Sequence, residues 1–175
     1  MEEQKLKADI KRIVKAGVIF IILIAFDLLT KSIAVNALED GKRIPLIPGA
    51  LEFYYIQNRG AAFGIFQNGT FILGVISAIA LAVIIFIYLR VPDGNKYLPL
   101  RLDLVFIAAG AAGNLFDRIT LQYVRDFIYF SLIDFPVFNV ADIYVTCSVF
   151  ILAYLILFYY KEEDLQFGGI NGKDQ

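Results

Sequence analysis

The chain has 175 residues, of which 59% are hydrophobic and 19% charged, and its formal net charge is −1. A soluble globular domain has about 45–50% apolar and about 25% charged residues, so this composition is typical of a membrane protein. The near-zero charge gives no reason to expect nucleic acid as a partner. With no histidine and a single cysteine, a zinc site and a histidine-activated nucleophile are nearly excluded.

The first element in chain order is an apolar run at residues 16–35, which follows a basic, polar segment. About 20 apolar residues suffice to cross a hydrocarbon core of about 30 Å. A basic start followed by an apolar run is also typical of a cleaved signal peptide. Because Asp27 and Lys31 interrupt the run and no small-residue cleavage site follows it, we predict a retained membrane helix.

Asp27 and Lys31 stand four residues apart and therefore share one face of that helix. Two interpretations are equally open. In the first, Lys31 extends its amine to the membrane interface and the pair has no further role. In the second, the pair faces the protein interior and supports a polar site.

Residues 36–70 form a mixed segment in which glycine and proline recur, so it is not a spanning helix. The sequence LEFYYIQ at 51–57 is aromatic and β-branched enough for a short strand. The sequence NRGAAFGIF at 58–66 predicts a turn and a short amphipathic helix at the membrane interface. We therefore expect a small extramembrane platform, in which glycines flank a candidate flap at 63–67.

Three further apolar runs, at residues 71–89, 102–119 and 140–160, complete a predicted bundle of four transmembrane helices. The run at 102–119 is rich in small residues, which let helices approach closely in lipid, so we expect it at the centre. Residues 165–175 are glycine-rich and are predicted to be a disordered tail. The predicted fold class is a single all-α membrane domain of four helices, with a β-strand platform and an interfacial helix.

Lysine and arginine are more frequent on one side of the predicted spans, which includes both ends of the chain and the loop between the second and third spans. The positive-inside rule therefore predicts that both termini lie in the cytoplasm. Polar residues far apart in the sequence then fall near the outer face. They are Asp27, Asn58, Asn114, Asp126 and Asp142.

Two of these acids are the best candidates for catalysis. Asp117 is adjacent to Arg118 and is interpreted as a structural ion-pairing residue, and Asp134 as exposed and non-catalytic. Arg125 is expected to point away from its neighbour Asp126, and no other basic residue that could pair with Asp126 or Asp142 is evident near them. Two carboxyl groups that share a partly dry site separate in pKa, so that one serves as base and the other as acid. Such a pair activates water against an amide carbonyl without a metal or a histidine.

Three other classes of function also use intramembrane acids. A proton- or ion-coupled transporter would need polar residues near the membrane midplane, where the second and fourth spans offer no charged one. A non-enzymatic scaffold would tolerate asparagine in place of Asp126 and Asp142. A magnesium-dependent enzyme acting on lipid head groups would be inhibited by a chelator.

Five sequence blocks resemble those of lipoprotein signal peptidase, the type II signal peptidase of bacteria. They occur in the family's order, from the first span to the last: FDLLTK at 26–31, QNRGAAFGIF at 57–66, GNLFDR at 113–118, VRDF at 124–127 and FNVAD at 138–142. No single block is specific, but the five together are.

The resemblance implies a four-span aspartyl endopeptidase of the bacterial inner membrane that uses no metal or other cofactor. Its substrates would be prolipoproteins, cut just before a cysteine that carries a diacylglyceryl group. Membrane lipid would surround the bundle, and we expect a monomer. The catalytic pair would be Asp126 and Asp142. The residues implied to hold the substrate or support the pair are Asp27, Lys31, Asn58, Gly60, Asn114, Arg118 and Asn139.

Overall fold

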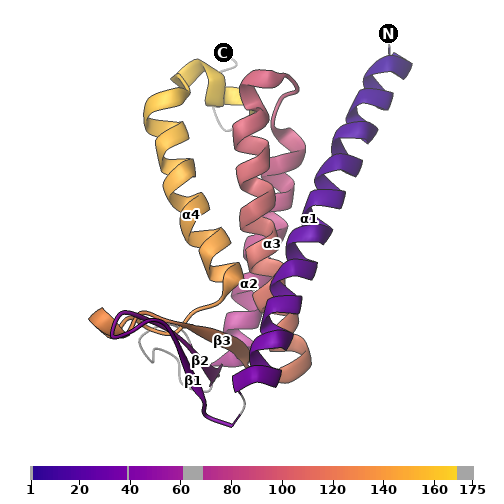
Figure 1. Ribbon diagram of the computed structural model, residues 1–175. Helices are drawn as coiled ribbons and strands as arrows, with labels where there is room; N and C mark the ends of the chain where they lie inside the picture. Colours follow the sequence, from indigo (N-terminus) through magenta and orange to yellow (C-terminus); the bar gives the residue numbers. More distant parts are fainter. Residues whose placement is uncertain (1, 39, 61–68, 169–175) are drawn as a thin grey trace.

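The computed structural model describes residues 2–38, 40–60 and 69–168. Four long helices lie side by side, and a small sheet lies at one end of the bundle (Figure 1). The helices are α1 (Glu2–Leu38), α2 (Thr70–Arg90), α3 (Leu98–Leu121) and α4 (Val140–Tyr154). The strands are β1 (Arg43–Ile47), β2 (Leu51–Asn58) and β3 (Val124–Tyr129). Short helical turns complete the chain: η2 (Asn95–Tyr97), η3 (Ser131–Ile133), η4 (Leu155–Tyr159) and η5 (Glu162–Gly168).

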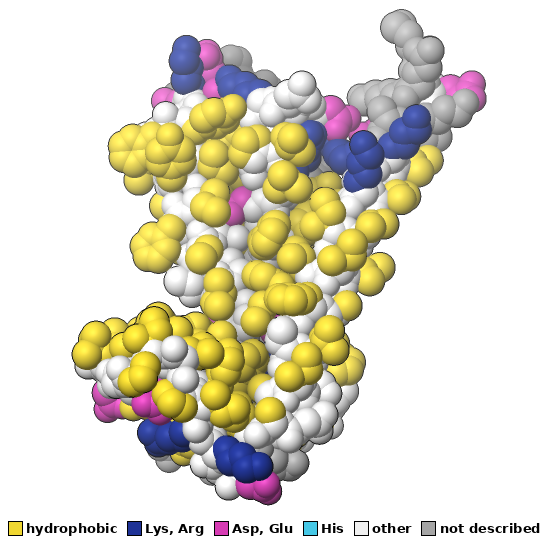
Figure 2. Space-filling view, in the orientation of Figure 1, with side chains coloured by type: hydrophobic (Ala, Val, Ile, Leu, Met, Phe, Trp, Pro, Cys, Tyr) yellow, Lys and Arg dark blue, Asp and Glu magenta, His cyan; other side chains and the backbone are white. Residues whose placement is uncertain are grey.

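Four helical segments are long and apolar enough to cross a membrane, which confirms the predicted four-helix bundle. They are Asp9–Leu38, Thr70–Arg90, Asn95–Leu121 and Val140–Tyr159. On the face seen in Figure 2, hydrophobic side chains predominate along the bundle, and most charged side chains gather at its two ends. The side chains of Phe71 and Phe150 are 79% and 72% exposed, as expected of residues that face lipid. Helix α1 begins well before the apolar run at 16–35, because the preceding polar residues continue the same helix.

Helix α3 packs against α1, α2 and α4 and is the most buried of the four spans. Two of its glycines lie where no side chain fits. A Cβ atom on Gly110 would collide with the carbonyl oxygen of Ala141, and one on Gly113 would collide with the carboxylate of Asp27. The small residues of α3 therefore let α1 and α4 approach its backbone, as predicted for this run.

The sheet has three antiparallel strands in the order β1-β2-β3. The strand at 51–57 was predicted from the sequence, whereas residues 124–129, between the third and fourth spans, were assigned no strand, so β3 is a correction. Val124, Phe127 and Ile128 suit a strand, but the partner strand lies far away in the sequence. The apolar face of the sheet packs Phe53 and Phe127 against α1.

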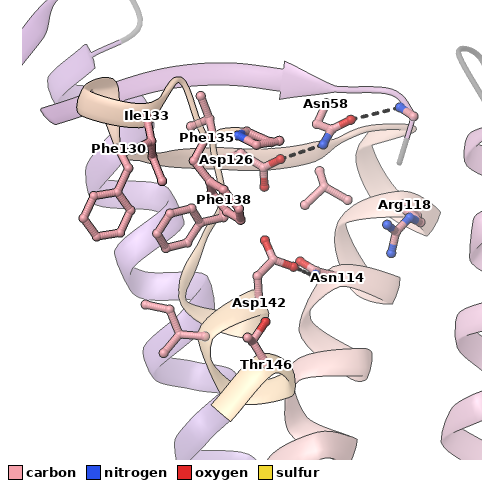
Figure 3. A pocket seen from close by; sticks show the side chains of 15 residues that line it. Asn58, Asn114, Arg118, Asp126, Phe130, Ile133, Phe135, Phe138, Asp142 and Thr146 are labelled. Atoms are coloured by element: carbon pink, nitrogen blue, oxygen red, sulfur yellow. Dashed lines mark hydrogen bonds between the residues drawn. The ribbon is translucent and has the colours of Figure 1, made fainter. Parts of the chain in front are cut away.

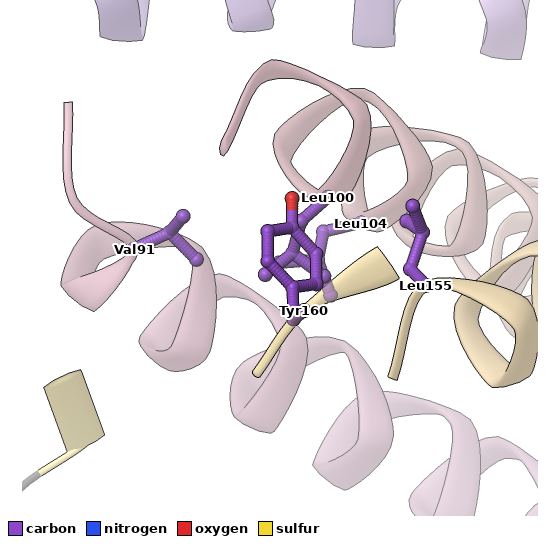
Figure 4. Close-up of a cluster of buried hydrophobic side chains, with 5 residues drawn as sticks. All are labelled: Val91, Leu100, Leu104, Leu155 and Tyr160. Atoms are coloured by element: carbon purple, nitrogen blue, oxygen red, sulfur yellow. The ribbon is translucent and has the colours of Figure 1, made fainter. Parts of the chain in front are cut away.

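The opposite end of the bundle has a second core, made of Val91, Leu100, Leu104, Leu155 and Tyr160 (Figure 4). Leu165 and Phe167 of η5 pack against this core. Residues 165–168, predicted as the start of a disordered tail, therefore form an ordered turn, because their apolar side chains find a packing surface. Residues 169–175 lie outside the described residues, as do the helix and the flap predicted within 61–68.

Candidate active site

A cavity of about 510 Å³ lies where the sheet meets the ends of α3 and α4 (Figure 3). Its apolar wall comes largely from the segment 130–138, which sequence analysis did not assign to the site. Its polar wall is formed by residues at the end of β2 and just after it, and by residues of α3, β3 and α4. They are Asn58, Gly60, Asn114, Arg118, Asp126, Asp142 and Thr146. In Figure 3, Asp126 and Asp142 point toward one another across the cavity.

Asp126 is placed by strand β3. Because side chains alternate along a strand, Val124 and Asp126 share a face, and they are only 3% and 2% exposed. The Oδ1 atom of Asp126 accepts a hydrogen bond of 2.6 Å from Asn139 Nδ2. Its Oδ2 atom accepts one of 2.8 Å from Asn58 Nδ2, and the Oδ1 atom of Asn58 accepts the backbone N–H of Gly60 at 3.0 Å.

Asp142 is placed by the start of helix α4. Asn139 is the N-cap, and Asp142 is the third residue of the helix. The Oδ1 atom of Asn139 accepts the backbone N–H of Asp142, and the Oδ2 atom of Asp142 accepts that of Asn139, both at 3.0 Å. This reciprocal capping box contributes about 1 kcal/mol to helices of this kind. The interactions that start α4 therefore also hold the carboxylate.

Two buried amides join the two acids. Asn114 Nδ2 donates to Asp142 Oδ1 at 2.8 Å. The Oδ1 atom of Asn114 in turn accepts a hydrogen bond from Asn139 Nδ2 at 3.1 Å. Each of the four carboxylate oxygens of Asp126 and Asp142 thus accepts an amide N–H. The arrangement fixes both carboxyl groups and leaves their remaining lone pairs available to the cavity.

Lys31 lies beneath this network and is fully buried together with Asp27. Lys31 Nζ is 2.8 Å from Asp27 Oδ2 and 3.6 Å from Asp117 Oδ2, and it donates to Asn114 Oδ1 at 2.9 Å. The Oδ1 atom of Asp27 accepts the backbone N–H of Ala141 at 2.9 Å. Of the two interpretations of this pair, the one in which it faces the interior is correct, and extension of Lys31 to the interface is wrong.

Asp117 is a structural ion-pairing residue, but its partner is not Arg118. Its Oδ1 atom lies 2.6 Å from Nη2 of Arg125, a residue that sequence analysis did not assign to the site. Arg118 instead donates to Ser77 Oγ at 3.3 Å and lines the cavity. Once residues 124–129 are recognised as a strand, alternation places Arg125 on the face opposite Asp126. No sequence pattern indicates the contact with Ser77.

The environment of Asp126 favours its protonated form. Burial, followed by the negative charge of Asp142, raises the pKa of Asp126 to about 7, against the effect of its hydrogen bonds from Asn58 and Asn139. A buried carboxyl that keeps its proton near neutral pH can act as a general acid. Of the nine residues predicted for the site, six line the cavity, Asp27 and Lys31 belong to the buried ion pairs, and Asn139 is hydrogen-bonded to both acids.

Comparison with known protein sequences gives consistent matches. Residues 19–158 match the family described as Signal peptidase (SPase) II. A protein of Clostridium novyi (strain NT) named lipoprotein signal peptidase is 37% identical over 142 residues, which cover 79% of this chain and 95% of the relative. One of the same name from Shouchella clausii (strain KSM-K16) is 42% identical over 143 residues, covering 81% of this chain and 93% of the relative.

Two solved structures, both described as bacterial membrane enzymes, have the same fold. The first, at 2.3 Å resolution, has a TM-score of 0.74 and 27% sequence identity, and the match covers 93% of this chain and 95% of that one. The second, at 1.9 Å resolution, has a TM-score of 0.73 and 29% identity, covering 85% of this chain and 96% of that one.

Proposed function

The chain belongs to the signal peptidase II family, whose members cleave signal peptides from prolipoproteins, and from this premise we propose that Asp126 and Asp142 perform the cleavage. The protein is a peptidase, and its four apolar helices make it a multi-pass protein of a bacterial inner membrane. We propose further that it is an aspartic peptidase that needs no metal. The cut falls just before a cysteine that carries a diacylglyceryl group.

The observation that carries this proposal is the pair of carboxyl groups held by amides on opposite sides of one cavity. Asp142 lies at the positive end of the α4 dipole and serves as the ionised base. It takes a proton from water, and the resulting hydroxide attacks the carbonyl carbon of the scissile bond. Protonated Asp126 polarises that carbonyl and then gives its proton to the departing amine.

Arg118 is the group best suited to stabilise the tetrahedral intermediate. The amides of Asn114 and Asn139 are already engaged with the two carboxyl groups, so they act by positioning. The guanidinium of Arg118 lines the cavity, and its Nη1 donates a hydrogen bond to the hydroxyl of Ser77. A preorganised cation of this kind stabilises developing negative charge in a partly dry site.

The apolar wall suits a substrate that is anchored in lipid. Phe130, Phe135 and Phe138 line the cavity beside the two acids. With both termini in the cytoplasm, as the positive-inside rule predicts, the cavity lies at the outer face, where acyl chains of a modified prolipoprotein are held. Anchoring raises the effective concentration of the scissile bond at the site. One chain supplies every residue of the network, which supports a monomer as the working unit.

Cleavage of a synthetic diacylglyceryl-modified prolipoprotein peptide by the purified protein in detergent tests this function. A chelator is present throughout, and the same peptide without its lipid is run in parallel. We expect only the lipidated peptide to be cut, before its cysteine. Equal cutting of both peptides would reject recognition of the lipid, and loss of activity that returns when metal is added would reject the metal-free mechanism.

The pH dependence of cleavage follows from the proton on Asp126. Because its pKa is raised to about 7, the proton is bound below that pH and is lost as the pH rises through it. We expect kcat to fall on the alkaline side of this value, because Asp126 then lacks the proton that it gives to the leaving amine. A kcat profile recorded in a single detergent measures this alkaline limb. A flat profile from about pH 6 to about pH 9 would exclude Asp126 as the acid.

A further inference from the structure

We propose that Arg125 is a positioning residue that fixes the offset between Asp126 and Asp142 and balances the charge beside them. This inference rests on the proposed function of the two acids. The family resemblance assigns no role to Arg125. Arg125 does not line the cavity either, because its side chain lies on the face of β3 away from Asp126. The observations that carry the proposal are its contacts with Asp117 and the charges around them.

Arg125 holds Asp117 through three hydrogen bonds. Its backbone N–H and its Nε–H each donate to Asp117 Oδ2 at 3.1 Å, and its Nη2 donates to Asp117 Oδ1 at 2.6 Å. The side chain of Arg125 is 15% exposed and that of Asp117 is fully buried. A two-pronged arginine–carboxylate contact of this kind is stronger and more directional than a surface ion pair.

These bonds tie the start of β3 to the end of α3. Between them the chain reverses at Gln122, which caps α3 in the left-handed conformation with φ of 64°. Asp117 is one helical turn after Asn114, the residue that donates to Asp142. The residue after Arg125 is Asp126. The contact between Arg125 and Asp117 therefore links the helix that orients one catalytic carboxyl to the strand that carries the other.

Arg125 also completes a neutral cluster of buried charges. The charged or titratable groups around the two acids are Asp27 and Lys31 of α1, Tyr55 of β2, Asp117 and Arg118 of α3, Arg125 of β3 and Tyr144 of α4. Burial alone would lower the pKa of Arg125, but its hydrogen bonds to Asp117 and the charge of Asp117 raise it, so it stays protonated.

Within this set, a chain of ion pairs runs from Asp27 through Lys31 and Asp117 to Arg125, and the four formal charges cancel. Loss of the Arg125 charge leaves one net negative charge next to the two acids. A negative charge favours proton binding by a nearby carboxyl group, so the alkaline limb of the activity profile, which reports the proton on Asp126, moves to higher pH.

Three variants separate position from charge. Arg125→Gln removes the charge, and we expect kcat/KM to fall on the order of tenfold, the effect of a small misplacement of catalytic groups. Its pH profile should move upward by roughly half a unit to one unit. Arg125→Lys keeps the positive charge but loses the planar guanidinium that donates to both oxygens of Asp117. We therefore expect kcat/KM to fall while the pH profile of activity stays in place. Arg125→Gln combined with Asp117→Asn restores neutrality, and the profile should return to its original position.

Arg43→Gln is the matched control, because Arg43 is an exposed arginine on the outer strand of the same sheet, paired with Glu52, and its loss should change neither quantity. A folded Arg125→Gln protein whose profile stays in place would overturn the charge role. A profile that stays displaced in the double variant would overturn it equally. Asp126→Asn is run alongside, because turnover by that variant would reject the catalytic pair itself, independently of Arg125.

Discussion

Asp126→Asn and Asp142→Asn are each expected to lower kcat for prolipoprotein cleavage by a factor of about 10³, within the range that general acid or base catalysis contributes. An amide can neither accept the proton of the attacking water nor give a proton to the leaving amine. Because the two acids have different roles on one reaction path, the double variant should be hardly worse than either single one.

The comparison requires folded protein, and an asparagine at either site meets a hydrogen-bond donor that the carboxylate accepted. Both oxygens of Asp126 accept amide N–H groups, so the NH₂ of an asparagine there meets a donor from Asn58 or Asn139. We expect a loss of stability on the order of 1 kcal/mol for such a mismatch. Thermal unfolding is therefore measured with kcat. Asp134→Asn, at an exposed carboxylate that accepts the hydroxyl of Tyr129, serves as the control. Turnover near that of the control in a folded Asp126→Asn protein would contradict the mechanism.

The helical part of this fold could be predicted from the sequence because membrane spans depend on length and hydrophobicity alone. The strand β3 could not, because its pairing partner is β2, whose position is set only when the bundle has formed. Asp126 was identified as a candidate by its chemistry, whereas its orientation depends on this pairing. The apolar wall of the cavity could not be predicted either, because residues 130–138 line the cavity only when the chain turns back from β3 toward α4.

The partner of Asp117 illustrates a second limit. Adjacent residues on a helix point in directions that differ by about 100°, so Asp117 and Arg118 do not face each other. This geometry argues against an ion pair between Asp117 and Arg118, but it does not indicate which other residue pairs with Asp117. Arg125 lies beside Asp117 only because the chain reverses at Gln122, and the left-handed backbone of Gln122 is unusual for a residue other than glycine. Likewise, spacing placed Asp27 and Lys31 on one face of α1, but only the packing of α3 and α4 decides that this face is buried.

Lys31→Met is expected to cost about 3–5 kcal/mol of stability, the amount typical of removing one partner of a buried ion pair. Lys31 is fully buried, and its amine contacts the carboxylates of Asp27 and Asp117. Methionine has a similar shape but leaves an uncompensated negative charge. Activity should fall as well, because the oxygen of Asn114 loses one of its two donors and keeps only Asn139, which weakens the orientation of Asn114 toward Asp142. Thermal unfolding in detergent and kcat measure the two effects.

Two further variants identify charge as the cause. Lys161→Met removes a lysine that is 79% exposed, so the unfolding temperature should not change. Lys31→Met combined with Asp27→Asn leaves Asp117 paired with Arg125 and restores neutrality, so much of the stability should return. Activity should not return to the same extent, because Asn114 still lacks the hydrogen bond from Lys31. Stability and activity recovering together would mean that Lys31 acts on the catalytic pair only through its charge, and the hydrogen bond to Asn114 would have no separate role.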